Sequence, residues 1–179
     1  GLVCFVALVS VFFASLGRNP VAMLSSLVVF ALGDTYSLSQ TLAKTTPILL
    51  CALVVAVPGR LGLISVGAEG QLHAGAIGGT AMVLLAPDLP GILLIPLMLC
   101  GAAAGGAAYG YVPGLLRTRL DVNETITTLL LNYVAVLLVS ALVFGIWRDP
   151  ESQGWPATIR LPAGAVLPAL PGTRIHLGL

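Results

Sequence analysis

The stretch GRLGLISVGAEGQLHAGAIGGT, residues 59–80, places a carboxylate, a carboxamide and an imidazole among glycines, small residues and aliphatic side chains. Four glycines lie between positions 59 and 70, directly after Pro58. Glycine and proline are the weakest formers of a continuous helix. The stretch therefore predicts a broken helix whose resumed part carries Glu69, Gln71 and His73.

Composition identifies the solvent that surrounds most of the chain. Of 179 residues, 58% are hydrophobic and 8% are charged, and the mean hydropathy is +1.03, whereas soluble domains carry about 25% charged residues. Such a chain cannot cover the outside of a soluble domain with charge. The net charge of +1 gives no reason to expect nucleic acid as a partner. We predict an all-α integral membrane protein in contact with the lipid bilayer.

Five apolar stretches approach or reach the roughly 20 residues that a membrane helix needs. They are Leu2–Leu16, Thr45–Leu63, Ile64–Ala86, Gly91–Leu116 and Thr125–Trp147. The shorter segment Val21–Leu32 precedes a polar stretch and is expected to lie along an interface, with a tilted sixth span as the alternative. The sequence thus predicts a polytopic helical bundle with about five spans.

Arginines set the expected orientation of the spans. Arg60 lies between the second and third stretches, and Arg117 and Arg119 lie between the fourth and fifth, whereas the connection between the third and fourth has no arginine. By the positive-inside rule, both basic connections face the cytoplasm. The Pro- and Gly-rich residues 148–179 then form an extracytoplasmic loop, although Arg148 at its start argues against this orientation.

Polar residues inside the apolar stretches are candidates for a transport pathway. An ionisable side chain costs roughly 2.5–3.5 kcal/mol at mid-span and usually faces a partner or a cavity. Glu69 and His73 share one helical face, so they either pair with each other or line a polar path. Asn132, inside the last stretch, must bond to another helix or face water.

Three further polar residues, Asp121, Asn123 and Glu124, stand at the start of the last stretch. Capping and acidic residues are favoured there, so capping alone explains them, or they belong to the same pathway.

The fourth stretch contains glycines at four-residue spacing, which lets helix backbones approach closely. Tight packing within the chain and a dimer interface are the two interpretations. The glycines are Gly101, Gly105, Gly106, Gly110 and Gly114.

Catalytic and nucleotide-binding motifs are absent from the sequence. It contains no G-x-x-x-x-G-K-[ST], no H-E-x-x-H and no G-x-S-x-G, and one of its two histidines, His176, lies in the tail. We predict that the chain is not an enzyme and has no catalytic residue, metal site or cofactor.

Two stretches carry a family resemblance. They are SLSQTLAKTTPILLCALVVAVPGRLGLISVGAEGQLHAGAIGG and LDVNETITTLLLNYVA. They resemble permease subunits of bacterial ABC importers of the branched-chain amino acid/ribose type, most closely the nucleoside and simple-sugar branch. Glu69 to Gln71 match the family's E-G-Q, with Ser65 where Asn is common. The second stretch is similar to the family's V-N-E-[VI]-I-[ST]-T-L-M-L-N-Y-I-A run, which it matches at Val122 to Glu124, Ile126, Thr128, Leu129 and Leu131 to Tyr133.

The resemblance implies a permease subunit of an ATP-driven importer in the bacterial plasma (inner) membrane. Such subunits have about ten spans and work with ATPase subunits, a second permease subunit and an extracytoplasmic substrate-binding protein. The family's ATPase-docking loop is not in this sequence, so residues 1–179 are expected to be the N-terminal part of one permease domain. The candidate residues for a pathway that takes a small polar solute, a nucleoside or simple sugar, are Ser65, Glu69, Gln71, His73, Asn123, Glu124 and Asn132.

Two other classes remain open at this point. In an ion-coupled secondary transporter or channel, Glu69 and His73 would relay protons. In a purely structural membrane scaffold, Glu69 would tolerate replacement by leucine.

Overall fold

The computed structural model describes residues 1–168, and their regular structure is helical apart from one β-bridge between Arg148 and Thr158. The helices are α1 (Leu2–Ser15), α2 (Pro20–Leu32), α3 (Thr35–Gly59), α4 (Ala68–Leu85), α5 (Gly91–Leu120), α6 (Glu124–Phe144) and the 3-10 turn η1 (Ala163–Ala165). The prediction of an all-α membrane protein is confirmed. The chain forms two compact units whose boundary, between Thr46 and Pro47, falls inside α3.

The first unit contains α1, α2 and the beginning of α3. Asn19 caps α2 by accepting a hydrogen bond from the Val21 N–H (3.0 Å). The Ser37 N–H donates to the Asp34 carboxylate (2.6 Å), which holds the pKa of Asp34 below its ordinary value. This carboxylate lies at the helix N-terminus, where negative charge is favoured. The helix therefore starts at Thr35, ten residues before the predicted span.

Among residues 1–168, three helices, α3, α5 and α6, are long and apolar enough to cross a membrane. The other two expected spans form shorter helices. The first, α1, has 14 residues, and α4 has 18 residues and carries the polar side chains that lower its hydropathy. Each of the five expected spans thus contains a helix. Among the described helices, three reach the length and hydropathy of a membrane span. Segment α2, with 13 residues, is short, as expected.

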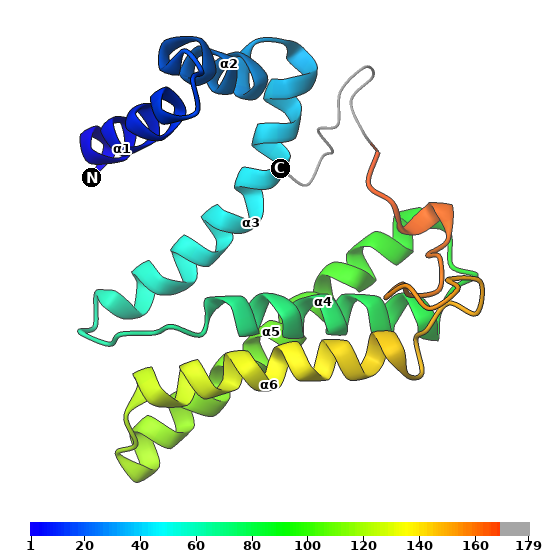
Figure 1. The fold of residues 1–179 in the computed structure, drawn as a ribbon. Coiled ribbons are helices and arrows are strands. Elements are labelled where there is room, and N and C mark those ends of the chain that lie inside the picture. The colour runs from blue at the N-terminus through cyan, green and yellow to red at the C-terminus, as the bar shows by residue number, and fades with distance from the viewer. Residues whose placement is uncertain (169–179) are drawn as a thin grey trace. The chain divides into compact units, whose positions relative to one another are not determined.

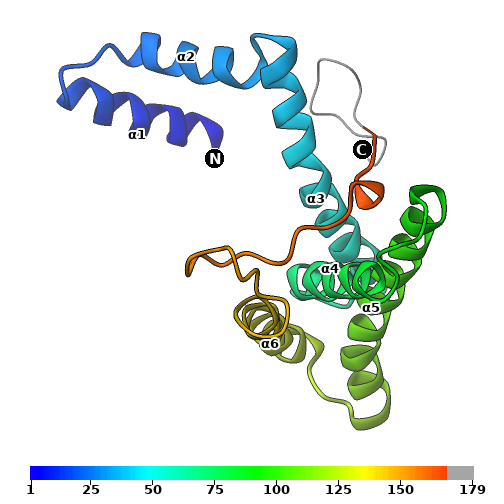
Figure 2. The ribbon, with the colours of Figure 1, turned by 90° about the vertical axis from the view of Figure 1, so that its right-hand side faces the viewer.

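In the second unit, α4 packs along α5 and less extensively along α6 (Figures 1 and 2). Glycines form the seam between α4 and α5. A Cβ on Gly101 would lie 2.7 Å from the Gly78 carbonyl oxygen, and one on Gly75 would lie 3.2 Å from the Ala102 carbonyl oxygen. These glycines pack helices within the chain, which is the first of the two interpretations of their spacing.

Residues 148–168 follow α6 without a further α-helix. The Asp149 N–H donates to the Ala157 carbonyl (2.9 Å). The turn η1 packs on the start of α5, where Ala165 joins Val83 and Leu94 in a small buried cluster. The extracytoplasmic side expected for residues 148–179 stays a prediction, and residues 169–179, with Arg174 and His176, lie outside the described residues.

The connections α3–α4 and α5–α6 lie at the same end of α4 and α6, and the α4–α5 connection lies at the other end (Figure 1). We expect Arg60→Cys and Arg119→Cys in the full transporter to react with a membrane-impermeant thiol reagent from one side of sealed vesicles. Asp88→Cys, in the α4–α5 connection, should react only from the other side. Labelling of Arg60→Cys and Arg119→Cys from opposite sides would refute this topology.

Candidate functional site

The break in the helix is the starting point of the site. Helix α3 ends at Gly59 and α4 begins at Ala68. Gly62 has a φ of +74°, a conformation that suits glycine. The predicted helix break is confirmed and extends from residue 60 to residue 67. Non-helical backbone at membrane depth must find hydrogen-bond partners within the protein. The N–H and C=O groups of residues 60–67 therefore need partners on neighbouring helices.

One face of α6 supplies these partners. We call Glu124, Thr125, Thr128 and Asn132 the α6 polar face. Glu124, Thr128 and Asn132 are four residues apart, so they lie one above another on the helix. Together the four side chains hydrogen-bond the backbone of the break and of the first turn of α4.

The bonds follow alternate residues of the broken segment. The Ile64 N–H donates to the Glu124 carboxylate (3.3 Å), and the Thr125 hydroxyl donates to the Ile64 carbonyl (3.0 Å). The Val66 N–H donates in turn to the Thr128 hydroxyl oxygen (3.1 Å). Both backbone groups of Ile64 are therefore satisfied by α6, much as a neighbouring strand would satisfy them.

Asn132 makes the closest contacts of the α6 polar face with the broken segment. Its side-chain NH₂ donates to the Val66 carbonyl (2.7 Å), and its side-chain oxygen accepts from the Gly70 N–H (2.8 Å). Gly70 leaves room for this bond, because a Cβ there would lie 2.7 Å from that oxygen. The structure thus gives Asn132 the first of its two expected roles, a bond to another helix.

The polar residues before α6 divide between two helices. Asn123 caps α6 by accepting from the Thr125 N–H (2.9 Å) and the Ile126 N–H (3.3 Å). Asp121 was expected to serve the same helix but is instead the C-cap of α5, with a φ of +52°. Its carboxylate pairs with Arg117 at 2.8 Å.

Beside the break, a cavity of about 170 Å³ opens between the end of α3, α4, α5 and α6. Apolar residues, including Pro58, Leu63 and Pro113, form much of its lining, and its polar lining residues are Ser65, Gln71, Arg117, Thr118, Glu124 and Thr128. We call it the polar cavity. The Gln71 carboxamide makes no hydrogen bond to any residue in 1–168 and has space because position 110 is glycine: a Cβ there would lie 2.8 Å from the Gln71 side-chain nitrogen. Three of the seven predicted residues, Ser65, Gln71 and Glu124, therefore meet in one cavity.

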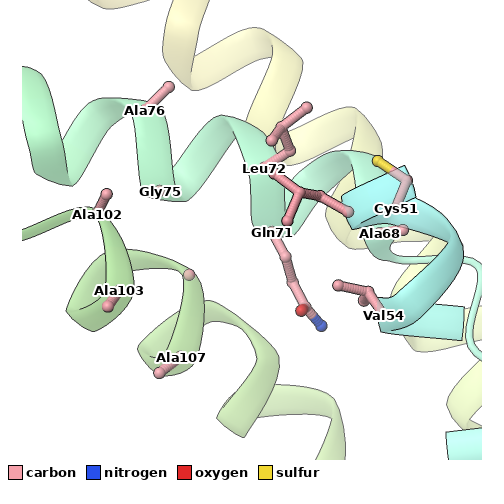
Figure 3. A pocket seen from close by; sticks show the side chains of 12 residues that line it. Cys51, Val54, Ala68, Gln71, Leu72, Gly75, Ala76, Ala102, Ala103 and Ala107 are labelled. Carbon is pink, nitrogen blue, oxygen red and sulfur yellow. The ribbon is translucent and has the colours of Figure 1, made fainter. Parts of the chain in front are cut away.

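A second, larger cavity of about 560 Å³ lies between α3, α4 and α5. Aliphatic and small side chains line it, including Val54, Leu72 and Ala103, and the Gln71 side chain points away from α4 into this space (Figure 3). Gln71 lines both cavities and is thus the polar residue that the two share.

Glu69 and His73 do not form the ion pair that was one of the two expectations. The His73 ring Nδ1 lies 2.8 Å from the backbone carbonyl oxygen of Glu69, one turn earlier, and not against its carboxylate. The Glu69 side chain is exposed. The ring is close enough to the helix backbone to satisfy itself there, so the pairing prediction is wrong. Neither residue lines the two cavities.

The predicted site residues did not include Thr125, Thr128 or Arg117, although Thr128 lies in the stretch that carries the family resemblance. Arg117 joins the α6 polar face through its Nε, 3.4 Å from the Glu124 carboxylate. The spacing E-x-x-x-T-x-x-x-N in NETITTLLLN could have indicated Thr128. Residues at i, i+4 and i+8 share a helical face, so Thr128 lies on the same face as Glu124 and Asn132. No comparable pattern marks Arg117. Within residues 1–168, no group of His, Cys, Asp and Glu side chains is placed to hold a metal ion.

Comparison with known proteins gives one matching family and several relatives. The model of the family described as branched-chain amino acid transport system / permease component matches residues 37–171. The glucose ABC transporter permease protein TsgB13 of Haloferax volcanii is 37% identical over 158 residues, which cover 88% of this chain and 41% of that protein. The nucleoside ABC transporter permease protein NupB of Lactococcus lactis is 36% identical over 132 residues, 74% of this chain and 36% of that protein.

A third relative, the guanosine ABC transporter permease protein NupP of Bacillus subtilis, is 34% identical over 153 residues, 82% of this chain and 42% of that protein. The chain spans about two fifths of the length of these curated relatives. No solved structure is significantly similar to it.

Proposed function

The chain belongs to the family of permease components of branched-chain amino acid transport systems, and on this premise we propose that it forms part of the translocation pathway of an ATP-driven importer. It is a multi-pass membrane protein. In this proposal, ATP is hydrolysed by separate ATPase subunits, a second permease subunit completes the pathway, and an extracytoplasmic substrate-binding protein delivers the solute. The transporter resides in the plasma (inner) membrane.

The observation that carries the proposal is that the helix break at residues 60–67 is hydrogen-bonded by the α6 polar face and lies beside Gln71. The α6 polar face satisfies the broken segment, so the backbone there costs little to keep non-helical. Gln71, one turn into α4, remains unpaired within residues 1–168 while lining both cavities. Broken helices near a path of solute movement are a common way to present hydrogen-bonding groups in transporters.

The solute proposed is a nucleoside or a simple sugar. The relatives described above carry names that refer to glucose, nucleosides and guanosine. Such solutes are neutral and rich in hydroxyl groups, which a carboxamide can bind as both donor and acceptor.

An ion-coupled transporter is the weaker alternative. It requires Glu69 and His73 to exchange a proton, but the His73 ring contacts the Glu69 carbonyl and not its carboxylate. The names of the three relatives also point to an ABC system.

The energy source distinguishes these classes. In cells carrying the complete transporter, we expect uptake of the solute to stop when ATP is depleted with the proton gradient maintained. Uptake should persist when a protonophore removes the gradient and ATP is kept high by substrate-level phosphorylation. The reverse pattern would refute the importer and favour the ion-coupled alternative.

Gln71→Leu is expected to lower the initial uptake rate about tenfold or more, the equivalent of one lost hydrogen bond of roughly 1.4 kcal/mol in the transport step. Membrane abundance should stay near that of the unmodified protein, because no hydrogen bond within residues 1–168 is broken. The matched control is Leu72→Gln, which moves the amide to the neighbouring position and should not restore uptake when combined with Gln71→Leu. Unchanged uptake in Gln71→Leu would remove this residue from the pathway.

A further inference from the structure

We propose that the polar cavity is a subsite for a single neutral sugar ring, either a free monosaccharide or the sugar part of a nucleoside. This proposal rests on the proposed function, because it names what the pathway accepts at this place. It adds Arg117, Thr118 and Gly114, none of which the sequence pattern singled out as binding residues.

The cavity is small and open on one side. About 170 Å³ is enough for several water molecules. The hydroxyl groups and ring oxygen of one sugar can take the places of these waters.

The lining of the cavity offers both hydrogen-bond donors and hydrogen-bond acceptors to a ligand. The Gln71 carboxamide offers an acceptor and two donors. The Ser65 oxygen accepts only one long bond, from the Gly67 N–H (3.4 Å), so its O–H is available. Thr118 donates its O–H to the Gly114 carbonyl (2.9 Å) and keeps its lone pairs. Sugar hydroxyls both donate and accept, and therefore match this set.

The charged side chains at the border of the cavity form ion pairs with one another. Arg117 lies 3.4 Å from the Glu124 carboxylate and 2.8 Å from that of Asp121. The Glu124 side chain is only 19% exposed, so stripping it of its partner would leave a poorly solvated charge. A phosphate, or the carboxylate of an amino acid, would compete with Glu124 and Asp121 for Arg117. A neutral ligand leaves these ion pairs intact.

Gly114 gives a direct probe of the cavity. A Cβ at Gly114 meets no atom within 4 Å, and Gly114 lines the cavity. Gly114→Cys therefore places a thiol in the open space without disturbing the helices. The matched control is Gly59→Cys, since a Cβ at Gly59 also meets no atom within 4 Å but Gly59 does not line this cavity. Both are made in the complete transporter with Cys4, Cys51 and Cys100 replaced by serine.

The rate of reaction with a small water-soluble methanethiosulfonate is measured with D-ribose, D-glucose, uridine or L-leucine present in excess. We expect labelling of Gly114→Cys to slow by about tenfold with at least one of the first three compounds and not with L-leucine. Protection by a free sugar assigns the subsite to monosaccharides, and protection by uridine alone assigns it to nucleosides. Gly59→Cys should react at one rate throughout.

A second measurement tests the role of Arg117. In Gly114→Cys with Arg117→Gln, Glu124 loses its partner, so a cationic methanethiosulfonate should gain rate relative to an anionic one. An unchanged ratio would show that the pair does not balance charge in the cavity, and would overturn the argument for a neutral ligand.

Two other results would overturn the subsite while leaving the importer in place. One is protection by L-leucine and by none of the sugars or uridine. The other is no protection by any compound that the same transporter imports in an ATP-dependent manner. If uptake by the unmodified transporter does not depend on ATP, the proposed function fails, and the subsite proposal fails with it.

Discussion

Replacing Asn132 by leucine is expected to deplete the permease from the membrane, and not only to slow transport. Leucine removes the donor to the Val66 carbonyl in the broken segment and the acceptor of the Gly70 N–H in the first turn of α4. Gly70 is buried, and a buried group left without a partner costs about 1–3 kcal/mol, which is a substantial part of the stability of an ordinary protein. We expect membrane abundance and the thermal stability of the purified transporter to fall together with uptake.

Tyr133→Leu is the matched control, because Tyr133 is the next residue in α6 and is 64% exposed. It should leave abundance near that of the unmodified protein. Asn132→Asp keeps the acceptor for Gly70 and loses the donor to Val66, so it is expected to fall between the two. Normal abundance and stability in Asn132→Leu, with uptake lost, would instead place Asn132 in the pathway itself.

Gly101→Val is expected to prevent α4 and α5 from packing. The added Cβ would lie 2.7 Å from the Gly78 carbonyl oxygen, which belongs to the backbone of α4 and cannot move without displacing the helix. Overpacking of this kind typically costs about 1–3 kcal/mol, and more when backbone must shift. The measurement is the amount of folded permease in the membrane, with the melting temperature of the purified transporter as a second reading.

Gly114→Val is the control on the same helix, because a Cβ at Gly114 meets no atom within 4 Å. It should preserve folding, although it fills part of the polar cavity. Equal loss of folded protein in the two variants would contradict the role given to the glycine seam. Of these two glycines, Gly101 faces the backbone of α4 and Gly114 does not.

Much of the fold follows from the sequence alone. An apolar chain with 8% charged residues has to satisfy its backbone internally in lipid, and helices do so within one segment. Pro58 and the glycines after it interrupt that pattern, which is why the break was predictable. The start of α3 was not predictable, because residues 35–44 are too polar on average to indicate a membrane span. Asp34 supplies the hydrogen bond at the N-terminus of this helix.

The candidate site divides in the same way. The sequence by itself determined that Gln71, Glu69, His73 and Asn132 are polar groups in apolar surroundings and so must find partners or a cavity. The tertiary structure alone decided which they found: Asn132 bonds the broken segment, His73 bonds the backbone of its own helix, and Gln71 is left facing two cavities. The physical reason is that periodicity fixes the face on which a side chain lies, whereas its hydrogen-bond partner depends on which backbone groups another helix or a broken segment brings within about 3 Å.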